Sequence, residues 1–210
     1  MLARGDELAA LGEAARGRLE ETHRAREEAL ACCRDTIRAC GLAIRAVHRL
    51  DSDAAAGRRS EAHDALRRAQ RVLAPFPALA AAGFLHDAEK EYAEACLTES
   101  LVSGTDLPGP QALEVGLAAW LNGLAEAASE LRRHLLDRLR SGEIARGEEL
   151  LGAMEEVYDL LATIEYPDAI TGGLRRGVDA LRAVVERSRA DVTTTVLQSR
   201  LQEAIEAAGS

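Results

Sequence analysis

The sequence is poor in aromatic residues, in proline and in lysine. Aromatic residues make up 3% of the 210 residues, and the chain contains 5 Pro. Lys90 is the only lysine among 26 Lys and Arg residues. Because 47% of the residues are hydrophobic but so few are aromatic, a core must be built mainly from Ala, Leu and Val. The same scarcity argues against a surface that stacks bases on aromatic rings.

Long apolar runs are also absent. No segment of about 18 apolar residues occurs, which excludes a membrane-spanning helix. The first seven residues, Met-Leu-Ala-Arg-Gly-Asp-Glu, lack the apolar core of a signal peptide. We therefore expect a cytoplasmic protein with no membrane partner.

The sequence lacks the common short motifs of catalytic and metal sites. Its four cysteines, Cys32, Cys33, Cys40 and Cys96, include no Cys-x-x-Cys pair, so neither a zinc motif nor a redox motif is supported. We expect these cysteines to be buried as small hydrophobic residues. There is no glycine-rich phosphate loop after a strand, no Gly-x-Ser-x-Gly and no His-Glu-x-x-His. A site must therefore be sought in less familiar patterns.

The pattern of apolar residues is helical almost throughout, and prolines mark its interruptions. Prolines occur at positions 75, 77, 108, 110 and 167, and no stretch between them reads convincingly as a strand. No linker is long enough to mark a domain boundary. The sequence therefore predicts one all-α domain over residues 1–210. The long helices are expected over residues 6–50, 52–73, 78–102, 111–140, 143–164 and from 168 or 171 to 207.

Two of the predicted helices carry a regular apolar seam. The first seam consists of Cys33, Ile37, Cys40, Ile44 and Val47. The second consists of Leu121, Leu124, Ala128, Leu131 and Leu135. Asn122, Glu126 and Glu130 lie on the opposite side of this second helix. In a monomer that side faces solvent, whereas in a ring or shell of subunits it lines an enclosed lumen.

Two pairs of carboxylates share helix faces. Glu91 and Glu94 fall in one narrow sector of the helix over residues 78–102, and Glu126 and Glu130 lie one turn apart on the helix over residues 111–140. Hard divalent cations prefer oxygen ligands, so two such pairs could build a metal site. The alternative is a solvated face, because the chain has 35 acidic residues and most of them must contact water.

A row of arginines follows the first predicted helix. Arg34, Arg38, Arg45 and Arg49 span only about 60° around its axis at 100° per residue. Residues 34–71 contain nine Arg and five acidic residues, whereas the whole chain has a net charge of −9. A local basic zone in an acidic protein favours a phosphate-binding face. The alternative is a solvated arginine face whose side-chain stems cover the edge of the core.

Several segments in a consistent order resemble the translin family. They are Glu91-Tyr-Ala-Glu-Ala95, Trp120-Leu-Asn-Gly-Leu-Ala-Glu-Ala-Ala-Ser-Glu-Leu-Arg-Arg133, Ser141-Gly-Glu-Ile144, Ile164-Glu-Tyr-Pro167 and Leu174-Arg-Arg-Gly-Val-Asp-Ala-Leu181. The segments from Arg26 to Leu30 and from Ala43 to Arg49 resemble the family's first helix. The resemblance covers nearly the whole chain and is closest to the catalytic branch of translin-associated factor X and to archaeal translin-like proteins.

The resemblance implies a fold, an assembly and an activity. It implies a seven-helix subunit in a closed shell, commonly an octamer, that binds single-stranded RNA or DNA, with a paralogous second subunit in some complexes. The catalytic branch is a Mg²⁺-dependent endoribonuclease, and Mn²⁺ is a related cofactor. Its four carboxylates correspond to Glu91, Glu94, Glu126 and Glu130, with Glu126 in place of the branch's usual Asp.

Two other functions remain open from the sequence. One is a shell that binds nucleic acid without cleaving it, and the other is a helical scaffold that binds only proteins. The arginine row argues against the scaffold, and the Glu91 and Glu94 pair argues against the inert shell.

Overall fold

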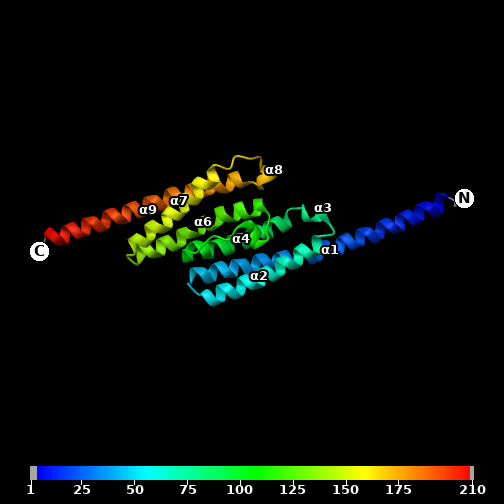
Figure 1. The fold of residues 1–210 in the computed structure, drawn as a ribbon, viewed down its shortest axis with the longest axis horizontal. Helices are drawn as coiled ribbons and strands as arrows, with labels where there is room; N and C mark the ends of the chain where they lie inside the picture. The colour runs from blue at the N-terminus through cyan, green and yellow to red at the C-terminus, as the bar shows by residue number, and fades with distance from the viewer. Residues whose placement is uncertain (1–3, 209–210) are drawn as a thin grey trace.

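The structure, a computed structural model, describes residues 4–208 (Figure 1). These residues form nine helices and no strand, which confirms the all-α prediction. The long helices are α1 (Arg4–His48), α2 (Ser52–Leu73), α4 (Phe84–Ser103), α6 (Leu117–Arg140), α7 (Ile144–Ala162) and α9 (Leu174–Ala208). The short ones are α3 (Pro77–Ala80), α5 (Pro110–Leu113) and α8 (Asp168–Thr171). The domain predicted over residues 1–210 also takes in residues 1–3 and 209–210, which lie outside the described part.

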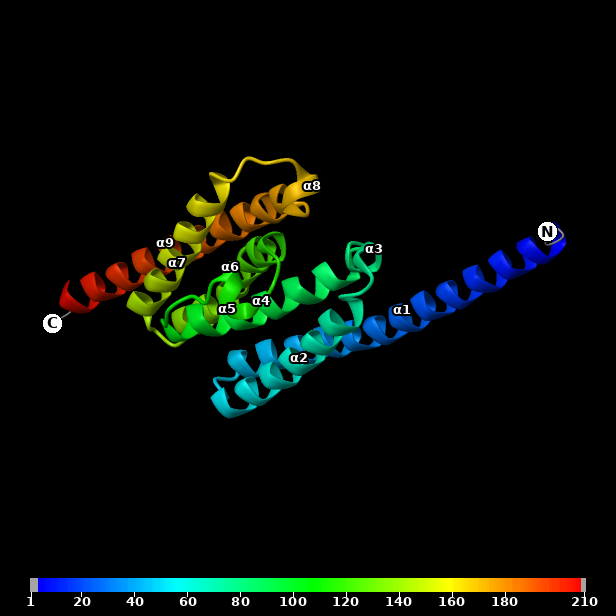
Figure 2. The same ribbon diagram turned by 45° about the vertical axis from the view of Figure 1, so that its right-hand side comes forward.

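Helices α4 and α6 lie side by side in the middle of the molecule (Figures 1 and 2). On one side α1 packs against α4, and α2 runs along α1. On the other side α7 and α9 both pack against α6. The first part of α1 and the last part of α9 extend in opposite directions beyond this packed region (Figure 1). The middle pair is thus covered by helices on both sides.

The core between these helices is built from leucine and alanine, as the composition predicts. The seam of Leu121, Leu124, Ala128, Leu131 and Leu135 on α6 is buried throughout. All four cysteines are buried and free, which confirms their expected role as small hydrophobic residues. Along residues 4–208, no helix combines the length and the apolar character needed to cross a membrane.

Three predicted helices are interrupted where the sequence pattern continues. The helix expected over residues 78–102 is divided, because Gly83 adopts a positive φ of 97° just before α4. Glu114, also at positive φ, ends α5 before α6 begins at Leu117. The glycine pair at 172 and 173 separates α8 from α9. The long helices still follow one another in the predicted order.

Two residues of the predicted seam of α1 are not fully buried: Ile37 is exposed and Ile44 is partly buried. Ile37 is 38% exposed, whereas Cys33, Cys40 and Val47 are buried. Helix α1 contacts both α2 and α4, so its buried face also includes Thr36, Ala39, Ala43 and Ala46. The centre of that wide face is turned away from Ile37, which is left at its margin.

Candidate functional site

The site is built where α4 and α6 approach each other closely, at Gly123 of α6. A Cβ atom at Gly123 of α6 would lie 2.8 Å from the backbone oxygen of Lys90 and 2.9 Å from the backbone nitrogen of Glu94. Only glycine fits there without a shift of one helix, although glycine inside a helix costs about 1 kcal/mol relative to alanine. Gly123 therefore sets the helix spacing at the level of Glu94.

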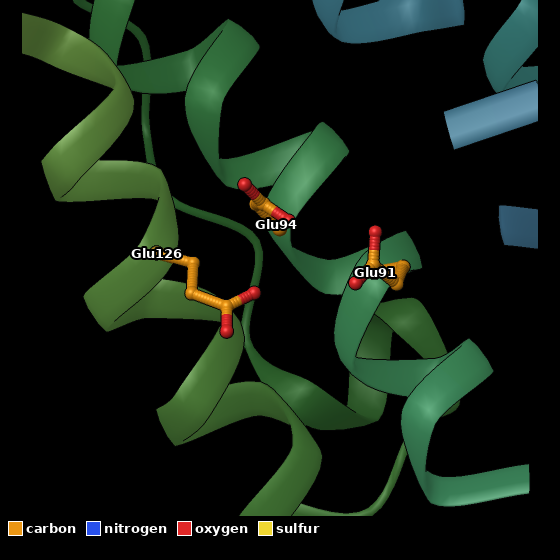
Figure 3. Close-up of side chains that lie close together, drawn as sticks. All are labelled: Glu91, Glu94 and Glu126. Atoms are coloured by element: carbon orange, nitrogen blue, oxygen red, sulfur yellow. The ribbon is translucent and has the colours of Figure 1, made fainter. Parts of the chain in front are cut away.

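This close approach brings together three of the four predicted carboxylates. One carboxylate oxygen each of Glu91, Glu94 and Glu126 lies within 4.8 Å of the others. Figure 3 shows the side chain of Glu126 extending from α6 toward α4, which carries Glu91 and Glu94. We call these three residues the carboxylate cluster. Glu126 stands where the catalytic branch usually has Asp. Its side chain is longer than that of Asp and still reaches the cluster.

A lysine lies against the cluster. The Nζ atom of Lys90 donates a hydrogen bond of 2.7 Å to Oε1 of Glu126 and lies 3.3 Å from Oε1 of Glu91. Burial on its own would lower the pKa of Lys90. The hydrogen bond to Glu126 and the negative charges of Glu126 and Glu91 outweigh burial, so the pKa of Lys90 is raised. Lys90 is therefore a firmly protonated partner of two cluster residues.

Glu94 is the most buried member of the cluster. Glu94 is only 8% exposed. No donor within residues 4–208 forms a hydrogen bond with its carboxyl group. Burial, followed by the negative charges of Glu126, Glu91 and Glu130, raises the pKa of Glu94 to about 8. In the metal-free protein near pH 7 this carboxyl group is mostly protonated.

Glu130, the fourth predicted carboxylate, is engaged elsewhere. His48 at the end of α1 donates from Nε2 to Oε2 of Glu130 over 2.7 Å, and His48 Nδ1 lies 3.1 Å from Nε2 of His134. The hydrogen bond from His48 lowers the pKa of the Glu130 carboxyl group, although burial opposes it. Burial, together with the charge of His48, lowers the pKa of His134 to about 4. Glu130 is thus a fixed anion beside the cluster.

The predicted arginine row is exposed on α1. Arg34, Arg38, Arg45 and Arg49 all face solvent. Arg38 is paired with Asp35 at 3.0 Å, whereas the other three form no ion pair within residues 4–208. Three unpaired guanidinium groups on one helix face leave a basic strip open to an anionic ligand.

The buried side of α1, away from the basic strip, faces the carboxylates. His48 lies three residues after Arg45 on the same helix and contacts Glu130 of α6. Cys40, also on α1, has its pKa raised mainly by burial, and the charges of Cys96, Glu91 and Glu94 add to the effect. The second half of α1 therefore borders the carboxylate cluster.

One predicted solvent-facing residue of α6 is buried. The amide of Asn122 donates to the backbone oxygens of Thr171 at 2.7 Å and Ala118 at 2.8 Å. The prediction that Asn122 shares the open side with Glu126 and Glu130 is wrong, because α8 packs over this turn of α6. Glu126 and Glu130 remain partly exposed.

Sequence reasoning missed Lys90 and His134 as parts of the site. Lys90 carries a signal in hindsight, because the only lysine of an arginine-rich chain stands directly before Glu91. His134 lies one helical turn after Glu130, on the same side of α6. No pattern in the sequence connects His48 with His134, because the two residues are 86 positions apart.

No model of a known protein family matches the chain. The uncharacterized protein MJ0175 of Methanocaldococcus jannaschii is 27% identical over 180 residues, which are 85% of this chain and 79% of that protein. The structure of AfC3PO, a protein of the translin family, is 31% identical with a TM-score of 0.78 and covers 89% of this chain and 97% of AfC3PO. The chain belongs to the translin family. The resemblance seen in the sequence is thereby confirmed.

Two further translin-family structures give the same fold. AfC3PO in complex with duplex RNA has a TM-score of 0.77 and 31% identity, and it covers 89% of this chain and 96% of AfC3PO. NeC3PO has a TM-score of 0.78 over 93% of this chain and 98% of its own. At 18% identity, the likeness to NeC3PO concerns the fold alone. Nearly the whole described chain is thus shared with translin proteins.

Proposed function

We propose that this protein binds RNA and cleaves it as a metal-dependent endoribonuclease. The observation that carries the proposal is the convergence of Glu91, Glu94 and Glu126 from two helices of a translin-family chain. The solved complex of AfC3PO with duplex RNA supports the RNA-binding part. The proposed substrate is single-stranded RNA, as the family resemblance implies. Single-stranded DNA is a further ligand to be tested.

The donor set of the carboxylate cluster fits Mg²⁺ or Mn²⁺. All three groups offer carboxylate oxygens, the ligands that hard cations prefer, within a span of 4.8 Å. Because the Glu94 carboxyl group has its pKa raised to about 8, it must release its proton to become a ligand. When bound, the ion supplies a Lewis acid and offsets charge on the phosphate under attack.

The other residues hold the substrate and shape the field around the cluster. Arg34, Arg45 and Arg49 would contact the RNA backbone without reading its sequence, because guanidinium groups pair with phosphate oxygens. Glu130 stays ionised through its hydrogen bond from His48 and adds negative charge near Glu94. We propose Glu130 as an outer member of the site, since its Oε2 atom is already engaged.

A second candidate is RNA binding without cleavage. The ion pairs of Lys90 with Glu126 and Glu91 favour it, because they neutralise part of the charge that a cation needs. One assay separates the two functions. We expect a labelled single-stranded RNA to be cut internally with Mg²⁺ and left intact with EDTA, and we expect Glu94→Gln to bind RNA but not cut it.

The control for this assay is Glu99→Gln, because Glu99 lies on the same helix and pairs with Arg59 away from the cluster. Cleavage that persists in Glu94→Gln, or binding without cleavage by the unaltered protein at every Mg²⁺ and Mn²⁺ concentration, would contradict the nuclease proposal. Running single-stranded and duplex RNA in parallel determines which form is the substrate.

A further inference from the structure

Lys90 is unusual both in the sequence and in its surroundings. It is the only lysine in a chain whose other basic side chains, histidine aside, are all arginine. Its ammonium group contacts carboxylates on two different helices, Glu91 on α4 and Glu126 on α6. The side chain is 21% exposed, so these ion pairs are partly shielded from water. Ordinary surface pairs on this protein, such as that of Arg16 with Glu13, join neighbouring turns of one helix.

The contacts of Lys90 involve the same groups that a divalent cation would use. Glu91 and Glu126 are two of the three residues whose carboxylate oxygens lie within 4.8 Å of one another. An ammonium group is a compact point charge with three donors, so it can bridge two carboxylates much as a small cation does. Arginine, with its broad planar head, would fit this narrow gap between helices less well.

The charges of the cluster remain unbalanced with Lys90 in place. Even with Glu94 protonated, Glu91 and Glu126 share a single ammonium group, and Glu94 receives no hydrogen bond from a donor within residues 4–208. A divalent ion would neutralise more of this charge than an ammonium group does. Two cations sharing the oxygens of Glu126 would also repel each other at short range.

We propose that Lys90 is a displaceable counter-ion of the carboxylate cluster, which competes with the divalent cation for Glu91 and Glu126. This inference rests on the proposed function, because the competing ligand is the cation of that site. Without metal, Lys90 holds the two carboxylates toward each other across the helix pair. When the cation binds, the ammonium group leaves them and its flexible stem turns toward solvent.

The first test removes the charge of Lys90. Lys90→Met keeps the length of the side chain and eliminates the competitor, so Mg²⁺ should bind about fivefold more tightly, the scale of one ion pair. Lys90→Arg keeps the charge and should stay nearer the affinity of the unaltered protein. Arg189→Gln is the matched control, because it removes one positive charge paired with Glu155 on the far side of the molecule. Isothermal titration calorimetry measures all four proteins.

The second test observes the lysine directly and leaves Lys90 itself unsubstituted. Reductive methylation with ¹³C-formaldehyde labels the Lys90 amine, and Lys90 gives the only side-chain signal because the chain has no other lysine. We expect this NMR signal to move toward the position of a methylated lysine in the unfolded chain as Mg²⁺ is added. In Glu94→Gln, where the cation site is disabled, the signal should stay in place.

The outcomes separate this inference from the proposed function. If Mg²⁺ binds equally to the unaltered protein and to Lys90→Met, and the Lys90 signal does not move, the counter-ion inference is wrong while the metal site stands. If neither protein binds Mg²⁺ or Mn²⁺, both the metal site and the inference fail. Tighter binding by Lys90→Met together with a moving Lys90 signal supports the inference.

Discussion

At the scale of single residues, Glu94 determines how the site responds to protons. Its carboxyl group is buried among other acids, and its pKa is raised to about 8. In the unfolded chain Glu94 has its ordinary pKa of 4.5 and is deprotonated above that pH. In the folded, metal-free protein Glu94 keeps its proton up to a pH of about 8. The resulting stability is fully present below pH 4.5 and is lost as the pH rises to about 8.

The first prediction is a loss of stability with rising pH in the absence of metal. In EDTA we expect the free energy of unfolding to fall between pH 6.5 and 8, by at most about 1.4 kcal/mol per pH unit for one proton. His134 does not change the free energy of unfolding in this pH range, because its pKa is lowered to about 4. The stability that the neutral His134 contributes is lost only as the pH falls below 6.5. Denaturant unfolding at several pH values measures the slope.

Glu94→Gln provides the control for this pH dependence. The amide cannot titrate, so the slope between pH 6.5 and 8 should flatten and the protein should be more stable than the unaltered chain at pH 8. A slope that is unchanged in Glu94→Gln would show that another group titrates in this range.

Residue spacing predicted part of the site but not all of it. The spacings of Glu91 with Glu94 and of Glu126 with Glu130 correctly place each pair on one helix side. Which members of the two pairs meet depends on the rotation of α4 against α6, and no sequence period records that rotation. Glu130 is directed to His48 instead, because α1 ends beside α6.

At the scale of helices, the approach of α4 to α6 at Gly123 is the feature that builds the cluster. The second prediction is that Gly123→Ala separates the helices. Its Cβ would meet the backbone of Lys90 and Glu94 at 2.8 and 2.9 Å, so we expect a destabilisation of about 1–3 kcal/mol and weaker Mg²⁺ binding. Unfolding measurements and calorimetry test both effects.

Gly152→Ala on α7 is the matched control. A Cβ at Gly152 meets nothing within 4 Å, so this substitution should stabilise its helix by about 0.5–1 kcal/mol and leave Mg²⁺ binding unchanged. Equal effects of the two substitutions would contradict a special role for the contact at Gly123.

The arginine row of α1 yields the third prediction. If it holds phosphates, Arg45→Ala with Arg49→Ala should reduce the slope of log affinity for single-stranded RNA against log salt by about 1.4, since each lost phosphate contact contributes about 0.7. Arg175→Ala with Arg187→Ala removes two exposed arginines of α9 and should leave the slope unchanged. An unchanged slope in the α1 variant would assign the row to ordinary surface.

Helix order was predictable, whereas helix ends were less so. The periodic seams identify the long helices because one face of each is buried. The break before α4 was missed because the alanines at positions 78, 80, 81 and 82 suit a helix, and only the conformation of Gly83 ends it. Ile37 was misplaced because the wide buried face of α1 follows its contacts with two helices.

At the scale of the whole molecule, the two extended helix ends are the parts that the subunit leaves uncovered. Residues 4–24 of α1 contain no buried residue and expose Leu8, Leu11 and Leu19. The end of α9 exposes Leu197, Leu201 and Ile205. Apolar side chains along two projecting helices favour association with further subunits.

The fourth prediction concerns this assembly. We expect light scattering to give a mass of several subunits, with eight as the proposed number, because a closed shell would turn Glu126 and Glu130 toward an enclosed lumen. Leu197→Glu with Leu201→Glu should lower the mass, whereas Arg200→Glu, on the same helix end, should not. A stable monomer at micromolar concentration would contradict the shell and its lumen.

The central claim is that Glu91, Glu94 and Glu126 together hold a divalent cation. The most direct measurement is anomalous diffraction from crystals of the unaltered protein grown with Mn²⁺. We predict an anomalous peak at about 2.0–2.6 Å from oxygens of all three carboxylates, with Nζ of Lys90 no longer bonded to Glu126. Crystals at saturating Mn²⁺ that show no peak among these carboxylates, with Lys90 still bonded to Glu126, would contradict the account.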